Sequence, residues 1–534
     1  MKKAVILVLL ISLNTYSQIE DAWVYFKNKP NASTYLSNPL SMLTQRALDR
    51  RSAQKISLDI SDVPIHEAYI EQVASLNGIV VMAKSKWFNA LHIRGAYTNI
   101  LALNTFSFVD KIEFANKALN SKSSKTVAYH LNKVNKNLET QTYNYGNSAN
   151  QIEMLNGHVL HQQNYKGQGK IIAVLDSGFQ NVDVASSFQN LISNNQILGG
   201  YNFPDRNTNY FSRHNHGTNV LSCMGSIVEN QLIGTAPLAQ YYLFITEDIF
   251  EENPVEESYW VEAAEMADYY GADIINSSLG YFEYDNPSYS HTYSDMIGTK
   301  AFASRGANMA FEKGMIVVVS AGNSGSSNNP HIGVLAKATK ALAIGAVDSN
   351  ENYVSFSSQG PSFDNRVKPD VCAKGLFTTI SSTTGAIVTS SGTSFSSPVI
   401  AGMVASLWSA VPSLSNIELT KYIVESADLF SNPTIFKGYG VPDFQRALSN
   451  AIFDLNNKLI TTLIYPNPVQ NSLTIESSIK NGNFLLFNNL GQLVKDERIS
   501  NNLQNISLES LQSGIYFYEI SAPNVLKRGK IVKQ

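Results

Sequence analysis

The stretch that decides the fold class is Lys170-Ile171-Ile172-Ala173-Val174-Leu175-Asp176. Its apolar residues follow one another without polar alternation, which predicts a strand buried on both faces, as in parallel sheets. Residues 273–275, 315–319 and 342–347 show the same character. These runs together predict a parallel sheet that is covered on both sides.

Helical patterns alternate with these apolar runs. Val220, Leu221 and Met224 follow His216 at the spacing of one helix face, and a longer apolar pattern follows Ser394. This alternation predicts a doubly wound α/β domain. Ligands bind at the carboxyl ends of the strands in such a sheet, so we expect the functional residues there. The residues at those ends are Asp176, 276–280 and 321–323.

Three short segments carry the residue types of a serine nucleophile and its helpers. They are Asp176-Ser177-Gly178, His216-Gly217-Thr218 and Gly392-Thr393-Ser394-Phe395-Ser396-Ser397-Pro398. A serine hydroxyl reacts poorly at neutral pH, so it needs a base that takes its proton and an acid that orients the base. The chain order Asp, His, Ser is one known solution. The Gly-x-Ser-x-Gly elbow, which would favour another arrangement, is absent from the sequence.

Each segment taken alone has a plainer interpretation. Gly-Thr-Ser commonly forms a turn or caps a helix, and an Asp after a strand is commonly a turn residue. A single His-Gly pair is commonly found in a loop. Only the joint pattern therefore indicates catalysis.

The joint pattern resembles the subtilisin-like serine proteases, or subtilases, from about residue 150 to about residue 450. Further segments carry the resemblance: Gly234-Thr235-Ala236-Pro237, Asn276-Ser277-Ser278-Leu279-Gly280, Ser320-Ala321-Gly322-Asn323, Phe356-Ser357-Ser358-Gln359-Gly360 and Lys368-Pro369-Asp370-Val371. The resemblance implies a subtilisin-like α/β domain. It also implies a secreted serine endopeptidase that hydrolyses peptide bonds through an acyl-enzyme intermediate.

The resemblance also implies a role for each candidate residue. Ser394 would attack the scissile carbonyl, His216 would take its proton, and Asp176 would orient the imidazole. Asn323 would stabilise the oxyanion together with the backbone N–H of Ser394. The segment Ser277-Ser278-Leu279-Gly280 would pair with the substrate backbone as an added strand.

This sequence departs from the family pattern at a few positions. Asn219 stands where the family often has a second His, and Ser396 stands where it usually has Ala. Ser396 and Ser397 are rival nucleophiles, and His214 is a rival base. Because Gly217 and Thr218 follow His216 and not His214, we expect His216 to be the base and His214 a loop residue.

The first part of the chain differs in pattern from the α/β region. Lys2 and Lys3 precede a short apolar run and small residues up to Ser17, which predicts a secretory signal peptide over residues 1–17. Residues 18–145 combine a helix pattern around Tyr69 and Val73 with short strand patterns, which predicts a small α+β domain. This domain resembles the inhibitory propeptides of subtilases. A separate binding domain stays open as an alternative.

The last part of the chain predicts a small β-sandwich. Short alternating segments such as residues 473–475 and 515–518 are separated by turn residues. The order of Tyr465-Pro466-Asn467-Pro468, Leu486-Phe487-Asn488-Asn489-Leu490-Gly491 and Ser513-Gly514-Ile515-Tyr516, with a basic end, resembles the C-terminal sorting domain of type IX secretion cargo. The resemblance implies a Bacteroidetes-type bacterium, export through the periplasm and outer membrane, and the type IX machinery as a partner.

Composition excludes several other classes of protein. The net charge of −3 gives no reason to expect a nucleic-acid partner, and no apolar run is long enough for a transmembrane segment. Two cysteines, Cys223 and Cys372, exclude a disulfide scaffold. They could pair, but we favour buried thiols because Cys223 falls on the helix that carries His216. No metal site is predicted: calcium stays open, since carboxylates such as Asp183 lack a recognisable loop spacing.

We therefore expect a signal peptide (1–17), a propeptide-like domain (18–145), a subtilisin-like peptidase domain (146–455) and a sorting β-domain (458–534). The expected partners are protein or peptide substrates, the secretion machinery and the chain's own propeptide as inhibitor. The expected location is the cell surface or the medium. The alternative is a catalytically inactive surface-binding protein on the same scaffold.

Overall fold

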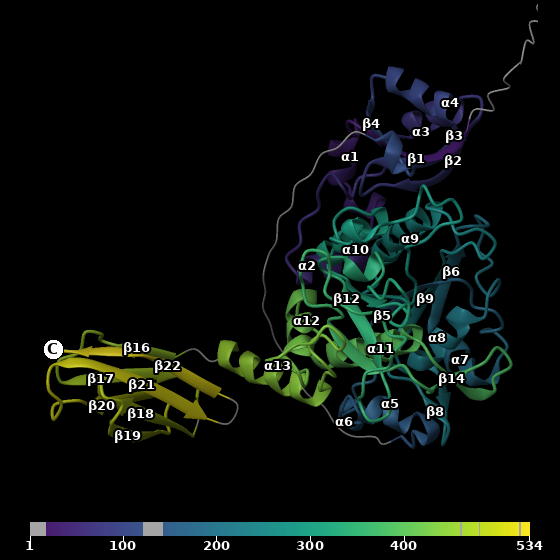
Figure 1. The fold of residues 1–534 in the computed structure, drawn as a ribbon. Helices are drawn as coiled ribbons and strands as arrows, with labels where there is room; N and C mark the ends of the chain where they lie inside the picture. Colours follow the sequence, from purple (N-terminus) through teal and green to yellow (C-terminus); the bar gives the residue numbers. More distant parts are fainter. Residues whose placement is uncertain (1–17, 121–142, 460–461, 480, 523–524) are drawn as a thin grey trace, which may run out of the picture.

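The computed structural model describes residues 18–120, 143–459, 462–479, 481–522 and 525–534. They form an N-terminal domain (residues 18–120) that packs on a central domain (143–459), and a C-terminal domain (462–534) beside the central domain (Figure 1). The expected signal peptide, residues 1–17, lies outside the described residues. Among the described helices, none combines the length and apolarity that a membrane span requires.

The central domain is built on a seven-stranded sheet in which all neighbouring strands run parallel. The strand order is β13-β12-β11-β10-β5-β9-β6. The strands are β5 (Ile171–Asp176), β6 (Ile197–Asn202), β9 (Gln240–Ile245), β10 (Ile274–Ser277), β11 (Ile316–Ser320), β12 (Leu342–Val347) and β13 (Val371–Lys374). All four apolar runs of the sequence lie on these strands, which confirms the predicted fold class.

The helices cover both faces of this sheet, and strand β5 shows why its sequence is apolar throughout. Ile172 and Val174 pack in one hydrophobic core with helices α8 (His216–Gly225) and α11 (Thr393–Ala410). Ala173 and Leu175 pack in the other core with α9 (Val255–Tyr270) and α10 (Phe302–Glu312). Because successive side chains of a strand point to opposite faces, a strand between two cores has no position for a polar residue.

Shorter elements complete the central domain. The remaining helices are α5 (Ala149–Glu153), α6 (Gly157–Gln162), α7 (Gln189–Ser193), α12 (Asn416–Glu425) and α13 (Phe444–Leu459). Two small hairpins are formed by β7 (Ile227–Val228) with β8 (Leu232–Ile233), and by β14 (Thr378–Ser381) with β15 (Ile387–Ser390). Cys223 on α8 and Cys372 on β13 are both buried and free, as we favoured.

The strand order reverses between β5 and β10. From β5 the chain moves to β6 and β9 on one side, and then to β10, β11, β12 and β13 on the other. A doubly wound sheet opens a crevice at the carboxyl ends of its strands where the order reverses. Asp176 ends β5 and Ser277 ends β10, so both border this crevice.

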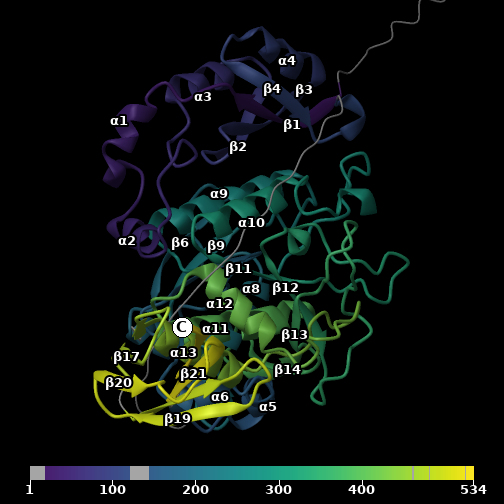
Figure 2. The same cartoon turned by 90° about the vertical axis from the view of Figure 1, so that its left-hand side faces the viewer.

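The N-terminal domain is an α+β unit, as predicted. Its antiparallel sheet has the order β2-β3-β1-β4. The strands are β1 (Ile19–Phe26), β2 (Ile79–Ser85), β3 (Ala90–Ala96) and β4 (Val109–Phe114); the helices are α1 (Ala32–Leu36), α2 (Gln45–Ala53), α3 (Glu67–Ala74) and α4 (Tyr97–Ala102). One sheet face packs on α3 and α4, and the other packs on α9 and α10 of the central domain (Figure 2).

A long connection between β1 and α3 leaves this sheet. We call residues 27–66 the arm; it contains α1 and α2 and has a small core of its own around Met42, Leu43, Ala47 and Val63. Figure 2 shows α2 beside one end of α9, below the sheet of the N-terminal domain. The sequence analysis assigned no element to this segment.

The C-terminal domain is rich in strands, as predicted, and two sheets enclose its core. One sheet has the order β16-β17-β20 and the other has the order β19-β18-β21-β22. The strands are β16 (Thr462–Tyr465), β17 (Ser472–Ser477), β18 (Gly482–Phe487), β19 (Leu493–Ile499), β20 (Leu503–Ser507), β21 (Gly514–Ala522) and β22 (Val525–Lys533).

Candidate active site

Asp176 and His216 form a hydrogen-bonded pair in the crevice between β5 and β10. The Asp176 carboxylate is fully buried, and its Oδ1 lies 2.7 Å from Nδ1 of His216. The backbone N–H of Ser177 also donates to this oxygen at 2.8 Å. His216 is the first residue of α8, and Gly217 follows it because a Cβ there would lie 2.4 Å from the carbonyl oxygen of Gly178. The glycine thus lets the helix start directly against β5.

The charge of Asp176 decides the proton affinity of His216. Burial acts to lower the pKa of His216, but the charge and the hydrogen bond of Asp176 outweigh it and raise this pKa above its ordinary value. An imidazole held through Nδ1 beside a carboxylate keeps Nε2 as its second nitrogen, and it is stabilised when it takes up a proton.

Ser394 lies at the start of α11, near the Asp176–His216 pair. The ring of Phe395, the next residue, has its centroid 6.1 Å from that of His216. The Ser394 hydroxyl donates to the carbonyl oxygen of Ser278 at 3.4 Å, and no His216–Ser394 hydrogen bond occurs among the described residues. In a site without substrate, the bond between nucleophile and base is often long and tightens only on binding.

Pro398 explains how the start of α11 is joined to the end of β10. A proline has no N–H, so Pro398 cannot bond to the carbonyl of Ser394 four residues earlier. That carbonyl instead accepts the hydroxyl of Ser278 at 2.9 Å. Pro398 therefore leaves the carbonyl oxygen of Ser394 without a helical donor, and Ser278, which follows β10, supplies the donor instead.

Asn323 lies on the loop that follows β11, and this loop is fixed to the first turn of α11. Its Oδ1 accepts the backbone N–H of Thr393 at 2.9 Å and the Thr393 hydroxyl at 3.0 Å. The oxygen of the amide is therefore occupied, which fixes the orientation of the side chain and leaves its NH₂ group as a donor near Gly392.

The segment from Ser277 to Gly280 follows the end of β10 and becomes more exposed along its length. Ser277 is fully buried, and its hydroxyl accepts a hydrogen bond from Trp260 at 3.0 Å. Ser278 contacts Ser394 as described above. Leu279 is half-buried and Gly280 is exposed. Only the later part of the segment is thus open to a ligand in this structure.

The rival residues are placed differently. The hydroxyl of Ser396 donates to the carbonyl of Thr393, and that of Ser397 donates to Asn276, both inside the core. His214 is exposed, and its ring accepts the backbone N–H of His216 at 3.3 Å. It lies in the loop before α8, as we expected.

Glu247 is a carboxylate near the site that the sequence analysis missed. It follows β9, which lies beside β5, and it accepts the hydroxyl of Tyr281 at 2.8 Å. Burial raises the pKa of Glu247 to about 8, and its charge acts to raise the pKa of His216. Its position in the sequence could have revealed it. Residues 240–245 form a partly apolar run, and Glu247 comes just after this run, at the same sheet edge as Asp176.

A metal site was left open by the sequence. Among the residues that the structure describes, no group of three or more His, Cys, Asp and Glu side chains is arranged to hold a metal ion.

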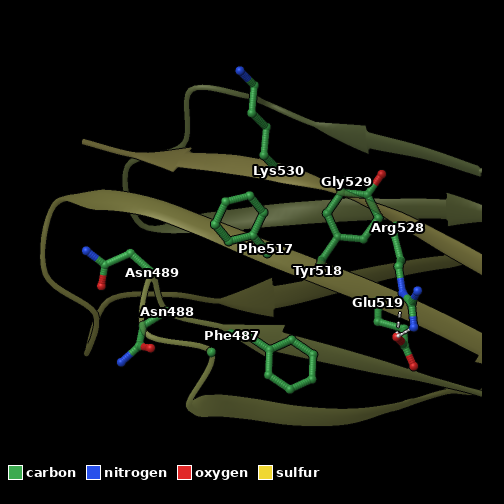
Figure 3. Close-up of a pocket in the computed structure, with 10 residues that line it drawn as sticks. Phe487, Asn488, Asn489, Phe517, Tyr518, Glu519, Arg528, Gly529 and Lys530 are labelled. Atoms are coloured by element: carbon green, nitrogen blue, oxygen red, sulfur yellow. Dashed lines mark hydrogen bonds and ion pairs between the residues drawn. The ribbon is translucent and has the colours of Figure 1, made fainter.

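A shallow pocket of about 660 Å³ lies on the C-terminal domain, away from Asp176 and His216. Phe487 and Phe517 line it together with an ion pair between Arg528 and Glu519 at 2.8 Å (Figure 3). The Phe517 side chain is half exposed. No residue of the predicted catalytic set belongs to this pocket.

Family models match the chain in three places. The model of the subtilase family matches residues 167–442. A peptidase S8 propeptide domain of Bacteroidota matches residues 21–130, and a secretion system C-terminal sorting domain matches residues 463–534.

Curated proteins similar to this chain cover the central domain. Subtilisin DY of Bacillus licheniformis is 30% identical over 289 residues, which is 54% of this chain and 92% of the relative. Subtilisin E of Bacillus subtilis (strain 168) is 28% identical over 299 residues, 55% of this chain and 70% of the relative. M-protease of Shouchella clausii (strain KSM-K16) is 27% identical over 297 residues, 55% of this chain and 68% of the relative.

Proposed function

Because the chain belongs to the subtilase family and is a serine endopeptidase, we propose that Asp176, His216 and Ser394 are its catalytic triad. The observation that carries the proposal is the 2.7 Å pair of Asp176 and His216 at the point of strand reversal, with Ser394 at the adjoining start of α11. A sorting domain at the end of the chain indicates that the enzyme is exported to the cell surface or the medium.

The first half of the reaction forms an acyl-enzyme. His216 takes the proton of Ser394 through Nε2 while the oxygen of Ser394 attacks the substrate carbonyl carbon, and the raised pKa of His216 favours this transfer. Asp176 stabilises the imidazolium that results. His216 then gives the proton to the leaving amine as the peptide bond breaks, and water repeats the sequence in reverse to release the acid.

The carbonyl oxygen becomes negative during each attack. We propose that the Asn323 amide and the backbone N–H of Ser394 donate to it. The two bonds that Thr393 makes to Asn323 support this role, because they orient the amide before substrate arrives. One such donor typically lowers the barrier by about 3–4 kcal/mol. The N-terminal end of α11 adds a positive potential at the same place.

The substrate would bind along the segment from Ser277 to Gly280. We propose that backbone groups of Ser278 and Gly280 pair with the substrate as an added strand, while the side chain of Ser277 serves the core. We further propose the boundaries 18–145 for a propeptide that covers and inhibits the site, 146–455 for the peptidase and 458–534 for the part that the type IX secretion machinery recognises.

Labelling with a fluorophosphonate probe tests the triad. The purified central domain, freed of the N-terminal domain, should react at Ser394 and should cleave denatured protein. Ser394→Ala should abolish both the labelling and the cleavage. Ser396→Ala should leave the labelling unchanged, since the hydroxyl of Ser396 donates to the carbonyl of Thr393 inside the core. A processed protein that neither reacts nor cleaves would instead favour an inactive surface-binding protein on this scaffold.

A further inference from the structure

The N-terminal domain holds the central domain at two separate places. Its sheet lies along the sides of α9 and α10, where Trp23 donates to Ser258 at 2.8 Å and Glu265 accepts the backbone N–H groups of Lys86 and Trp87. The arm, in contrast, covers the C-terminal ends of the same two helices. This second contact lies at the edge of the central sheet where β10 and β11 begin, opposite to the catalytic crevice.

The arm supplies donors to carbonyl groups that the two helices leave open. The last carbonyls of a helix have no partner within it, and the negative end of the helix dipole attracts cations. Thr44 donates to the carbonyl of Tyr269, and Arg46 donates to that of Gly271 at 3.1 Å. Arg50 reaches the carbonyls of Ala272 and Lys313. One short helix, α2, thus caps α9 and α10 together.

Two arginines of α2 are buried against one carboxylate of the central domain. Arg51 bonds to both oxygens of Asp268, at 2.8 and 3.0 Å, and Arg50 bonds to the same carboxylate. The side chains of Arg51 and Asp268 are 2% and 0% exposed. Burial acts to raise the pKa of Asp268, but the charges of Arg51 and Arg50 hold it below its ordinary value. The carboxylate is therefore ionised and depends on the arm for its neutralisation.

A cation of the central domain is likewise paired with carboxylates of the arm. Lys313 of the central domain is 2% exposed, and its ammonium lies 3.1 Å from Asp62 and 3.2 Å from Asp59, both in the arm. Asp62 in turn binds Arg51 at 2.9 Å. Gly314, next to Lys313, has a φ of +94°, which favours glycine, and a Cβ there would lie 2.9 Å from the side chains of Gln54 and Ile56. The two surfaces are complementary in charge and in shape.

We propose that the arm is a latch that retains the N-terminal domain on the central domain after the chain between them has been cut. The latch rests on the proposed function, since it assumes a propeptide that is separated by cleavage. Removing Arg51 leaves the buried Asp268 with Arg50 alone, so its charge is less well compensated, and the loss of a buried charged partner acts mainly on the dissociation rate. Release of the active enzyme then requires the Arg51–Asp268 contact to open, as well as a cut.

The test separates retention from catalysis. A chain that carries Ser394→Ala, and so cannot process itself, receives the recognition sequence of a site-specific protease between residues 120 and 143. After cleavage by that protease, gel filtration follows how fast the N-terminal fragment leaves the remainder. We expect the fragment to co-elute with the remainder, and Arg51→Met to speed its dissociation at least about 30-fold. Because Ser394 is absent throughout, the result does not depend on the proposed triad.

Arg46 provides the matched control. It lies on the same helix and pairs with Asp273 at 2.5 Å, but its side chain is 40% exposed. An exposed pair contributes little, so Arg46→Met should change the dissociation rate by less than about 5-fold. The melting temperature of each uncut variant reports whether it folds. If Arg51→Met does not fold, Arg51→Ala decides, since it also removes the guanidinium group that binds Asp268 and Asp62. Immediate loss of the fragment from the parent, or parental retention in the folded Arg51 variants, overturns the latch.

Discussion

At the scale of single residues, the protonation of His216 depends mainly on Asp176, with a smaller contribution from Glu247. Asp176 has a buried carboxylate that binds Nδ1 of the imidazole at 2.7 Å. Its charge overcomes the effect of burial, which alone would lower the pKa of His216. Since only the neutral imidazole is a base, this shift has a direct consequence for activity.

We predict that the activity of the enzyme falls on the acidic side with a pKa above the ordinary value for histidine. Asp176→Asn removes the charge, so the pKa of His216 should drop and the acidic limb of kcat/KM should move to lower pH. The maximal rate should fall by about 10⁴-fold, because the amide no longer holds the required tautomer. The measurement is kcat/KM on a peptide substrate as a function of pH.

His214 is the control for this experiment. It is exposed and contacts His216 only through the backbone N–H, so His214→Asn should keep the acidic limb of the parent. If the limb moves with His214 and not with Asp176, the assignment of the base is wrong.

At the scale of elements, β10 and α11 are connected through an acceptor that Pro398 leaves open. The Ser278 hydroxyl donates a hydrogen bond to the carbonyl oxygen of Ser394. A residue other than proline at position 398 would donate its backbone N–H to this oxygen within the helix. The geometry around Ser394 is thus set partly by a residue four positions along the helix.

A double-mutant cycle tests this connection. In a Ser394→Ala background, which prevents self-digestion, Ser278→Ala should cost about 1–3 kcal/mol because the carbonyl of residue 394 is left buried and unpaired. With Pro398→Ala present, a new N–H reaches that carbonyl, and the cost of Ser278→Ala should fall by about 1 kcal/mol. Denaturant unfolding followed by tryptophan fluorescence measures both. Equal costs in the two backgrounds would show that the two residues are not coupled, and Ser409→Ala on the same helix should be neutral.

Elements with a strong apolar signal could be predicted from the sequence, and those stabilised by charge could not. Strands β5 and β12 are continuous apolar runs, and helix α8 follows His216 with clear periodicity. Helix α2, by contrast, buries Arg50 and Arg51. A charged residue is ordinarily assigned to the surface, because its burial is favourable only beside a partner far away in the chain. Asp268 is such a partner, more than two hundred residues away.

The same contrast between local patterns and long-range contacts explains which residues of the candidate site could be predicted from the sequence. Asp176, His216 and Asn323 lie at a strand end, a helix start and a loop beside the crevice, where the order of strands and helices predicts them. The side chain of Ser277 contacts Trp260, and that of Glu247 contacts Tyr281. No local sequence pattern predicts either contact.

At the scale of the whole molecule, the C-terminal domain has a hydrophobic core of its own, whereas the N-terminal and central domains share one. The C-terminal domain buries residues such as Phe484, Leu486 and Ile520 in a core that contains no residue of the central domain. Its connection to the central domain runs along α13 and β22. The proposed catalytic residues lie at the crevice between β5 and β10, and none of them belongs to the C-terminal domain.

We predict that removing residues 460–534 separates activity from export. The shortened enzyme, once processed, should keep kcat/KM on a peptide substrate within about twofold of the processed parent, because neither large core beside the central sheet contains a residue of the removed segment. In its native host it should accumulate inside the cell, since the matched sorting domain is gone. Activity assays on purified protein and immunoblots of cells and medium measure the two effects. A more than tenfold loss of activity would mean that the C-terminal domain supports the site, and normal export would mean that another segment carries the sorting signal.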